Sequence, residues 1–300
     1  MLNKNHTILN SSGCWASNET QLDELFNTKL NAIITKTCTL HLKNGNVEPT
    51  FYSLGNLHIN SKGLPNEGYN HYKILYNKYN SNNKKYILSV AWESNENNTL
   101  ELLTDYNNHV TKKELVELNL SCPNLDHEIP SYNYTLLDKI LKLINNLNLN
   151  NLIFSLKLSP FLDHQLCDKI INTINTNNNS NIYKYIVLSN SIPNGLILNN
   201  GTPALSNIFG GLSGKLNKYI ALSNVYYFKN NLDKNIEIIG CGGISNVHDI
   251  KDYLNNGAHY VQLGSCFYDS VTNSLDYDKI NSVITTYENK NNVSKTSLKI

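Results

Sequence analysis

Short runs of apolar and β-branched residues recur along the chain, and each run ends in small, polar or glycine residues. The run at residues 116–120 shows the pattern most clearly, because Val116, Leu118 and Leu120 alternate with Glu117 and Asn119. A period of two is typical of a β-strand. The runs that predict strands are residues 7–10, 33–37, 87–91, 116–120, 154–158, 185–188, 236–240 and 260–263.

Amphipathic helical patterns lie between most of these runs. Asn18 is the predicted N-cap of a helix that carries Leu22, Leu25 and Phe26 on one face. Further helical faces are formed by Leu136, Leu137, Ile140, Leu141 and Ile144, by Leu166, Ile170, Ile171 and Ile174, and by Val247, Ile250 and Leu254, the last with Ser245 as N-cap and Gly257 as its closing glycine. Repeated strand–helix alternation predicts an α/β fold, a parallel (β/α)8 TIM barrel, with a doubly wound open sheet as the alternative.

Two long connections, residues 38–85 and 191–217, interrupt this alternation. Loops of that length in a compact domain are usually functional, and we expect them to lie over the C-terminal face of the barrel. The asparagine-rich tract at residues 175–181 predicts a solvated surface turn or an expanded loop. No inter-domain linker is evident, so residues 1–300 are expected to form a single barrel domain.

Composition narrows the range of partners. The net charge is +1 and the sequence contains no arginine, so cationic contacts must come from lysine or histidine. We therefore expect no nucleic-acid partner and no membrane partner. The six cysteines are scattered singly, which favours reduced thiols in a reducing compartment. Without a signal-peptide pattern or a membrane-spanning apolar run, the expected location is cytoplasmic.

The predicted strand ends carry polar residues that core packing would not place there. They are Ser12 with Gly13, Lys36, Ser89, Asn119 with Cys122, Lys157, Asn190 with Ser191, Gly242 with Gly243, and Gly264 with Ser265. Active groups of barrel enzymes lie at the carboxyl ends of the strands. A lysine inside a strand, as Lys36 and Lys157 are predicted to be, is costly if it points into an apolar layer.

Cys122 is the candidate for proton transfer, since Pro123 ends its strand and Asn119, Ser121 and Asn124 flank it. The alternative is a small apolar core residue. The glycines at 242–243 and 264 predict a phosphate site on backbone amides, to which Gly210 and Gly211 add a close backbone approach. No Ser–His–Asp arrangement and no metal-ligand spacing stands out. A phosphate anchor, two lysines and a thiol suit flavin chemistry.

Seven motifs together resemble the class 1A dihydroorotate dehydrogenases. They are N-L-S-C-P-N, I-T-K-T, I-N-S-K-G-L-P-N, L-K-L-S-P, F-G-G-L-S-G, I-I-G-C-G-G-I and V-Q-L-G-S, in the family's order. The resemblance implies a (β/α)8 barrel that contains FMN and forms a homodimer in the cytosol. It also implies that (S)-dihydroorotate is oxidised to orotate in pyrimidine biosynthesis, with fumarate as acceptor and succinate as its product.

The resemblance also implies roles for single residues. Cys122 corresponds to the base that removes the C5 proton, with Lys36 and Lys157 beside the reaction. The implied substrate contacts are Lys36, Asn60, Lys62, Gly63, Leu64, Asn119, Asn124, Asn190 and Ser191. The FMN shell implied by the motifs and strand ends is Ser12, Gly13, Lys36, Thr37, Ser89, Asn119, Lys157, Ser191, Gly211, Gly242, Gly243, Gly264 and Ser265.

The sequence departs from the family at a few positions. Lys62 stands where the family has methionine, and Lys43 and Thr50 stand where it has arginine. The loop at residues 125–131, expected to close over the substrate, is one residue shorter than in the family. These departures leave two alternatives open: an FMN barrel acting on another dihydropyrimidine, and a catalytically weakened protein that binds flavin or orotate.

Overall fold

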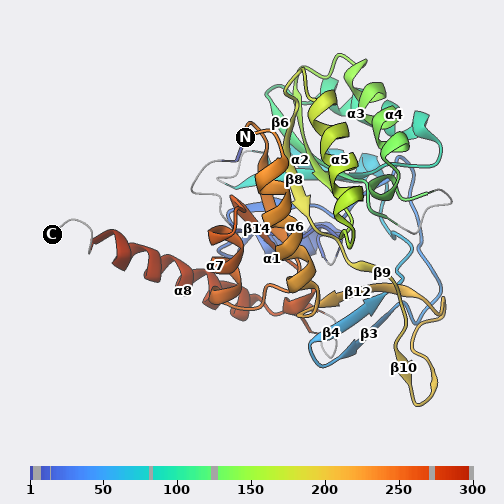
Figure 1. Cartoon of the computed structure of the whole chain (residues 1–300). Helices are drawn as coiled ribbons and strands as arrows, with labels where there is room; N and C mark the ends of the chain where they lie inside the picture. Colours follow the sequence, from blue (N-terminus) through green and yellow to red (C-terminus); the bar gives the residue numbers. More distant parts are fainter. Residues whose placement is uncertain (3–7, 14, 81–83, 123–127, 270–273, 297–300) are drawn as a thin grey trace.

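Eight parallel strands close into a barrel in this computed structural model, which describes all residues except 3–7, 14, 81–83, 123–127, 270–273 and 297–300 (Figure 1). The barrel strands are β1 (Ile8–Asn10), β2 (Ala32–Ile34), β5 (Lys85–Ala91), β6 (Glu114–Asn119), β7 (Leu152–Lys157), β8 (Tyr183–Leu188), β13 (Glu237–Cys241) and β14 (Tyr260–Leu263). Each pairs with the next along the chain, and β14 pairs with β1. The predicted TIM barrel is therefore confirmed, and the open-sheet alternative is wrong.

The helices surround this barrel (Figure 1). They are α1 (Glu19–Phe26), α2 (Tyr69–Tyr79), α3 (Glu96–His109), α4 (Tyr134–Asn145), α5 (His164–Asn177), α6 (Asn217–Asn231), α7 (Val247–Asn255) and α8 (Tyr277–Thr296), with short 3-10 turns η1 (Pro130–Tyr132) and η2 (Ser265–Phe267). Within the described residues, no helix combines the length and the apolar character needed to cross a bilayer.

Two separate apolar layers explain the alternation along the strands. One cluster joins strand and helix residues and includes Val116, Leu118 and Leu120. The second cluster contains no helix residue, includes Leu115, and so fills the interior of the barrel. Since side chains alternate along a strand, Glu117 and Asn119 share the interior face with Leu115. Glu117 and Asn119 therefore point toward the barrel axis, where both are buried.

Helix caps follow the local sequence, with one correction. Asn18 caps α1, since its side chain accepts a hydrogen bond from the Gln21 amide at 3.0 Å. The cap of α7 is Asn246 rather than Ser245, because Asn246 and Asp249 form a reciprocal capping box. Gly257 follows the C-terminus of α7 with φ +116°, as predicted.

The asparagine-rich tract is only partly a surface turn. Helix α5 continues to Asn177, and the Asn178 side chain bonds both the amide and the carbonyl of Tyr183. Asn177 and Asn178 are both buried, so the solvated turn predicted over residues 175–181 is wrong for these positions.

The two long connections meet in one antiparallel sheet of order β3-β4-β12-β9. Its strands are β3 (Phe51–Leu54), β4 (Leu57–Asn60), β9 (Ile192–Gly195) and β12 (Gly210–Gly214). Two small hairpins, β10 (Leu198–Asn199) with β11 (Thr202–Pro203) and β15 (Tyr268–Asp269) with β16 (Ser274–Leu275), complete the fold. The sheet lies at the lower side of the barrel in Figure 1, and β10 projects beyond it.

The sheet brings Asn60 opposite Gly211, although the two are far apart in sequence. This pairing needs glycine, because a Cβ atom on Gly210 would lie 2.6 Å from the Asn60 carbonyl oxygen. The close approach of this glycine pair to a bound phosphate stays a prediction; here the pair lets two strands of the sheet approach each other.

Candidate active site

A cavity opens at the carboxyl ends of the barrel strands. Most of the predicted site residues line it, namely Ser12, Gly13, Lys36, Thr37, Asn60, Lys62, Leu64, Asn119, Cys122, Lys157, Asn190, Ser191, Gly211, Gly242, Gly243, Gly264 and Ser265. Ser89 and Gly63 are not among the lining residues. Asn124 lies outside the described residues, as does the beginning of the predicted lid.

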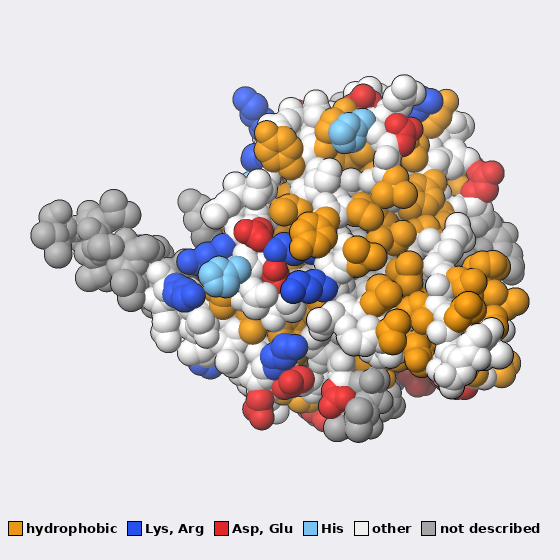
Figure 2. Space-filling view, turned by 60° about the horizontal axis from the view of Figure 1, so that its bottom comes forward, with side chains coloured by type: hydrophobic (Ala, Val, Ile, Leu, Met, Phe, Trp, Pro, Cys, Tyr) orange, Lys and Arg blue, Asp and Glu red, His pale blue; other side chains and the backbone are white. Residues whose placement is uncertain are grey.

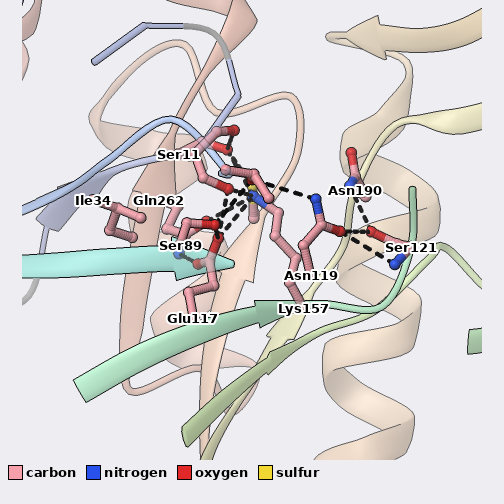
Figure 3. A network of polar contacts seen from close by, with 12 residues as sticks. Ser11, Ile34, Ser89, Glu117, Asn119, Ser121, Lys157, Asn190 and Gln262 are labelled. Atoms are coloured by element: carbon pink, nitrogen blue, oxygen red, sulfur yellow. Dashed lines mark hydrogen bonds and ion pairs between the residues drawn. The ribbon is translucent and has the colours of Figure 1, made fainter. Parts of the chain in front are cut away.

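Lys157 is the last residue of β7 and lies almost fully buried at the base of the cavity. Its ammonium donates hydrogen bonds to Ser11 Oγ at 3.0 Å, Ser12 Oγ at 3.2 Å and Gln262 Oε1 at 3.2 Å. Glu117 Oε1 lies 3.8 Å from the same nitrogen. Figure 3 shows these side chains converging from different barrel strands. Partners on three sides hold the buried charge in one position.

Lys36 differs slightly from its prediction. Strand β2 ends at Ile34, so Lys36 follows the strand rather than lying inside it. Its ammonium donates to the Gly13 carbonyl oxygen at 2.6 Å and so ties the loop after β1 to the cavity wall. Both lysines are buried, and neither lies at the outer rim in solvent.

Ser89 reaches the cavity only through a neighbour. Its hydroxyl lies 2.9 Å from Thr37 Oγ1 and 3.4 Å from Glu117 Oε1. Thr37 lines the cavity and Ser89 lies behind it. Ser89 is thus placed to support Thr37, and its expected direct contact with the cofactor stays a prediction.

Cys122 lies beside a chain of carboxamides and hydroxyls. Asn190 Nδ2 donates to Ser121 Oγ at 2.5 Å, and Ser121 Oγ donates to Asn119 Oδ1 at 2.8 Å. Asn119 Nδ2 in turn donates to Thr37 Oγ1 at 3.4 Å. Cys122 is 6% exposed and packs with Leu64 and Ala91. This arrangement gives the thiol a polar cavity on one side and an apolar wall on the other.

The glycine loop after β13 forms a tight backbone turn. Gly242 and Gly243 have φ values of +132° and +63°, which disfavour any residue with a Cβ atom. A Cβ atom on Gly243 would also lie 2.7 Å from the Lys218 amide nitrogen. Tyr253 donates its hydroxyl hydrogen to the Gly242 carbonyl oxygen at 2.7 Å. Helices α6 and α7 thus hold this loop from behind.

Asp249 anchors the same loop at the start of α7. Its carboxylate accepts from the Ser245 amide at 2.9 Å and the Asn246 amide at 3.2 Å, and pairs with Lys218 Nζ at 2.6 Å. Burial raises the pKa of the Asp249 carboxyl, but hydrogen bonds from Lys218 and Ser245 outweigh burial and leave the pKa below its ordinary value. Asp249 is therefore an ionised anchor for the loop.

Lys62 stands on the sheet side of the cavity. Its ammonium lies 5.7 Å from the centroid of the Phe51 ring and 5.9 Å from that of Tyr268. Cation–π contacts of this kind hold the charge over the two rings. Thr50 donates its hydroxyl hydrogen to Glu48 Oε1 at 2.8 Å.

Several lining residues were not predicted from the sequence. They are Ser11, Phe51, Ser189, Ser213, Gly214, Asn217, Cys241, Ile244, Gln262, Cys266 and Tyr268. Gln262 carried a usable signal, because a polar residue interrupts the apolar run of β14. Glu117 carried the same signal on β6. In the described part of the chain, no cluster of three or more His, Cys, Asp or Glu side chains could hold a metal ion.

Comparisons with known proteins identify the family of this chain. The model of the dihydroorotate dehydrogenase family matches residues 2–283. The dihydroorotate dehydrogenase (fumarate) of Lachancea kluyveri is 34% identical over 281 residues, which cover 88% of this chain and 85% of the relative. The putative dihydroorotate dehydrogenase A (fumarate) of Streptococcus agalactiae is 31% identical over 263 residues, covering 86% of this chain and 82% of the relative.

A solved structure supports the fold independently. The DHODH of Eimeria tenella, crystallised in complex with ferulenol, superimposes with a TM-score of 0.72 at 14% identity, covering 96% of this chain and 82% of that one. Such low identity bears on the fold alone. The sequence relatives described above are enzymes named for the fumarate type. The family model that matches residues 2–283 and these relatives show that this chain belongs to the dihydroorotate dehydrogenase family.

Proposed function

We propose that this protein oxidises (S)-dihydroorotate to orotate in pyrimidine (UMP) biosynthesis, with FMN as cofactor and fumarate as the electron acceptor that becomes succinate. One observation carries the proposal. The buried thiol of Cys122 lines the same cavity as Lys36, Lys157 and the glycine loop after β13. The fumarate-type names of the relatives support the choice of substrate and acceptor.

The residues present fit a phosphorylated flavin. The turn at Gly242 and Gly243, with the loop at Gly264 and Ser265, offers backbone amides that suit a phosphate. At the strand ends, Lys157 and Asn119 offer a charge and an amide for the polar edge of an isoalloxazine ring. When bound, the flavin would accept the electron pair that leaves dihydroorotate as a hydride.

Cys122 is the proposed base that takes the C5 proton of dihydroorotate. The thiolate is the reactive form of a cysteine, so Cys122 must lose its own proton before it can take one from the substrate. The apolar wall formed by Leu64 and Ala91 excludes water from one side of the sulfur. The opposite side faces the cavity, where Asn119 and Asn190 orient the substrate.

Substrate selectivity would come from the carboxamides. Asn60, Asn119 and Asn190 line the cavity, and each offers a donor and an acceptor to a pyrimidine dione. Lys36, Lys62 and Ser191, and the backbone of Gly63 and Leu64, complete the proposed contacts; Asn124 stays a prediction. A ligand that left buried amides unpaired would bind more weakly, so analogues without the ring carbonyls should be rejected.

We also propose a homodimer. Four large hydrophobic residues of one connection, Leu196, Leu198, Ile208 and Phe209, are 46–57% exposed. Figure 2, which brings the lower side of Figure 1 forward, shows hydrophobic side chains gathered over one half of this face. An extended exposed apolar surface favours contact with another chain. The cytoplasmic location stays a prediction from the sequence.

An anaerobic half-reaction tests the proposed function. Protein loaded with FMN should lose its yellow colour when dihydroorotate is added, and fumarate should restore the colour faster than NAD, a quinone or oxygen does. Failure to bind FMN, or a flavin spectrum unaffected by dihydroorotate, would contradict the proposal. Bleaching by a different dihydropyrimidine alone would replace the substrate but keep the flavin chemistry.

A further inference from the structure

A buried carboxylate lies behind the cavity without lining it. The side chain of Glu117 is 1% exposed and that of Lys157 is 2% exposed. Among the described residues, no aspartate or glutamate lines the cavity itself, whereas Lys36, Lys62 and Lys157 do. Glu117 is therefore the carboxylate that reaches Lys157 from inside the barrel.

The two charges are joined through a closed ring of hydrogen bonds (Figure 3). Ser12 Oγ accepts from Lys157 at 3.2 Å and donates to Glu117 Oε1 at 2.5 Å. Gln262 Oε1 accepts from Lys157 at 3.2 Å, while its Nε2 donates to Glu117 Oε2 at 2.6 Å. Both carboxylate oxygens of Glu117 are thus occupied, and both bridging side chains are oriented by it.

The distances show that Lys157 is hydrogen-bonded to the bridging side chains and only electrostatically paired with Glu117. The Lys157 ammonium lies 3.8 Å from the carboxylate, beyond an ordinary hydrogen bond, whereas its contacts with the bridging atoms are 3.0–3.2 Å. Glu117 therefore acts on Lys157 in two ways. It fixes the bridging side chains, and it offsets the charge of the ammonium across a short gap in a medium that screens weakly.

We infer that Glu117 is a positioning residue that holds Lys157 against the bound flavin and lowers the flavin's midpoint potential. The inference rests on the proposed function. In that reaction the Cys122 thiolate would take the C5 proton of dihydroorotate, and the flavin, when bound, would supply the acceptor for the C6 hydride with its two electrons. The flavin gains negative charge on reduction, so a nearby carboxylate disfavours the reduced form and a nearby ammonium favours it.

The variant Glu117→Gln tests the inference, with Glu114→Gln as the matched control. Glu114 is on the same strand, its side chain is 4% exposed, and it pairs with Lys112 at 3.6 Å and Lys85 at 3.9 Å. It begins β6, three residues before Glu117 and about 10 Å farther from the cavity. Each variant loses one buried carboxylate, but only Glu117→Gln loses the carboxylate next to Lys157.

Glutamine keeps the size and one acceptor oxygen of glutamate, and Lys157 keeps its bonds to Ser11, Ser12 and Gln262, so the variant removes the charge alone. Glu117→Gln should therefore favour binding of reduced over oxidised FMN by about tenfold relative to the wild type. For a two-electron couple, a tenfold change in the ratio of the two affinities corresponds to a rise of about 30 mV in the midpoint potential. Glu114→Gln should leave the potential unchanged. An unchanged or lower potential in Glu117→Gln, or an equal shift in both variants, would overturn the inference.

A second comparison covers the case in which Glu117→Gln fails to fold, since breaking a buried ion pair is costly. Lys157→Gln should lower the flavin potential, and the double variant Glu117→Gln/Lys157→Gln should recover most of that loss. Equal potentials in these two variants would overturn the inference. If the wild type did not bind FMN, the proposed function itself would be contradicted. Failure of the inference and failure of the proposed function can therefore be told apart.

Discussion

Replacing Asp249 with asparagine should destabilise the folded protein by removing one charge from the anchor of the glycine loop. Asp249 accepts hydrogen bonds from Ser245 and Asn246 and pairs with Lys218 at 2.6 Å. Asparagine keeps one acceptor oxygen for the helix cap but cannot balance the ammonium. The Lys218 side chain is only 11% exposed, so solvent replaces the lost partner poorly.

The magnitude follows from the partner that remains. Breaking a fully buried ion pair costs about 3–5 kcal/mol. Lys218 retains Asp252, also at 2.6 Å, but the Asp252 side chain is 48% exposed and screened by water. We therefore expect Asp249→Asn to lower the free energy of unfolding by about 2 kcal/mol. Asp252→Asn, which removes the exposed partner of the same ammonium, should cost only about 0.5 kcal/mol.

Urea unfolding followed by circular dichroism compares the two variants with the wild type at neutral pH. The free energy of unfolding should fall more in Asp249→Asn than in Asp252→Asn. Asp249→Asn should also bind FMN more weakly, because the loop after β13 is less firmly held. Equal losses of stability in the two variants would refute the reasoning, since both carboxylates lie at the same distance from Lys218.

The pH dependence has a definite sign. The pKa of Asp249 is lower in the folded protein than its ordinary value. Its stabilisation is thus present above the unfolded pKa of about 3.9 and is lost as pH falls through the lower folded pKa. The stability difference between wild type and Asp249→Asn should therefore narrow below about pH 4. A difference that widened on acidification would contradict the assignment of Asp249 as an ionised anchor.

Three further substitutions probe the site. Cys122→Ser should slow flavin reduction about 100-fold and raise its pH optimum, because a hydroxyl is a much weaker acid than a thiol. Unchanged rates of flavin reduction in a stopped-flow experiment would show that Cys122 is not the base. Gly211→Ala would place a Cβ atom 2.3 Å from Ser191 Oγ, so the serine must rotate and orotate should bind more weakly in a spectral titration. Tyr253→Phe removes the hydrogen bond to the Gly242 carbonyl and should cost about 1 kcal/mol in urea unfolding.

Strand positions were predictable because they depend on local patterns. Each of the eight predicted runs overlaps a barrel strand, and most of the residues at their ends line one cavity. Local reasoning was less accurate at boundaries. Lys36 falls beyond the end of β2, and Asn246 rather than Ser245 caps α7, since both residues can cap and only backbone geometry chooses between them.

Contacts between distant segments were not predictable in the same way. The pairing of Asn60 with Gly211 joins two separate connections, and no local periodicity encodes which strands pair across that separation. The ring around Glu117 was missed for a different reason. A polar residue alternating with apolar ones usually faces solvent, but helices cover every strand of a closed barrel, so Glu117 faces the axis.

The measurement that tests the central claim most directly is a single-turnover experiment without oxygen. FMN-loaded protein is mixed with dihydroorotate in the absence of any acceptor, and flavin absorbance and orotate are quantified together. The account predicts one orotate formed for each flavin reduced, with the rate strongly reduced in Cys122→Ser. Flavin that stays oxidised, or that is reduced without forming orotate, would contradict it.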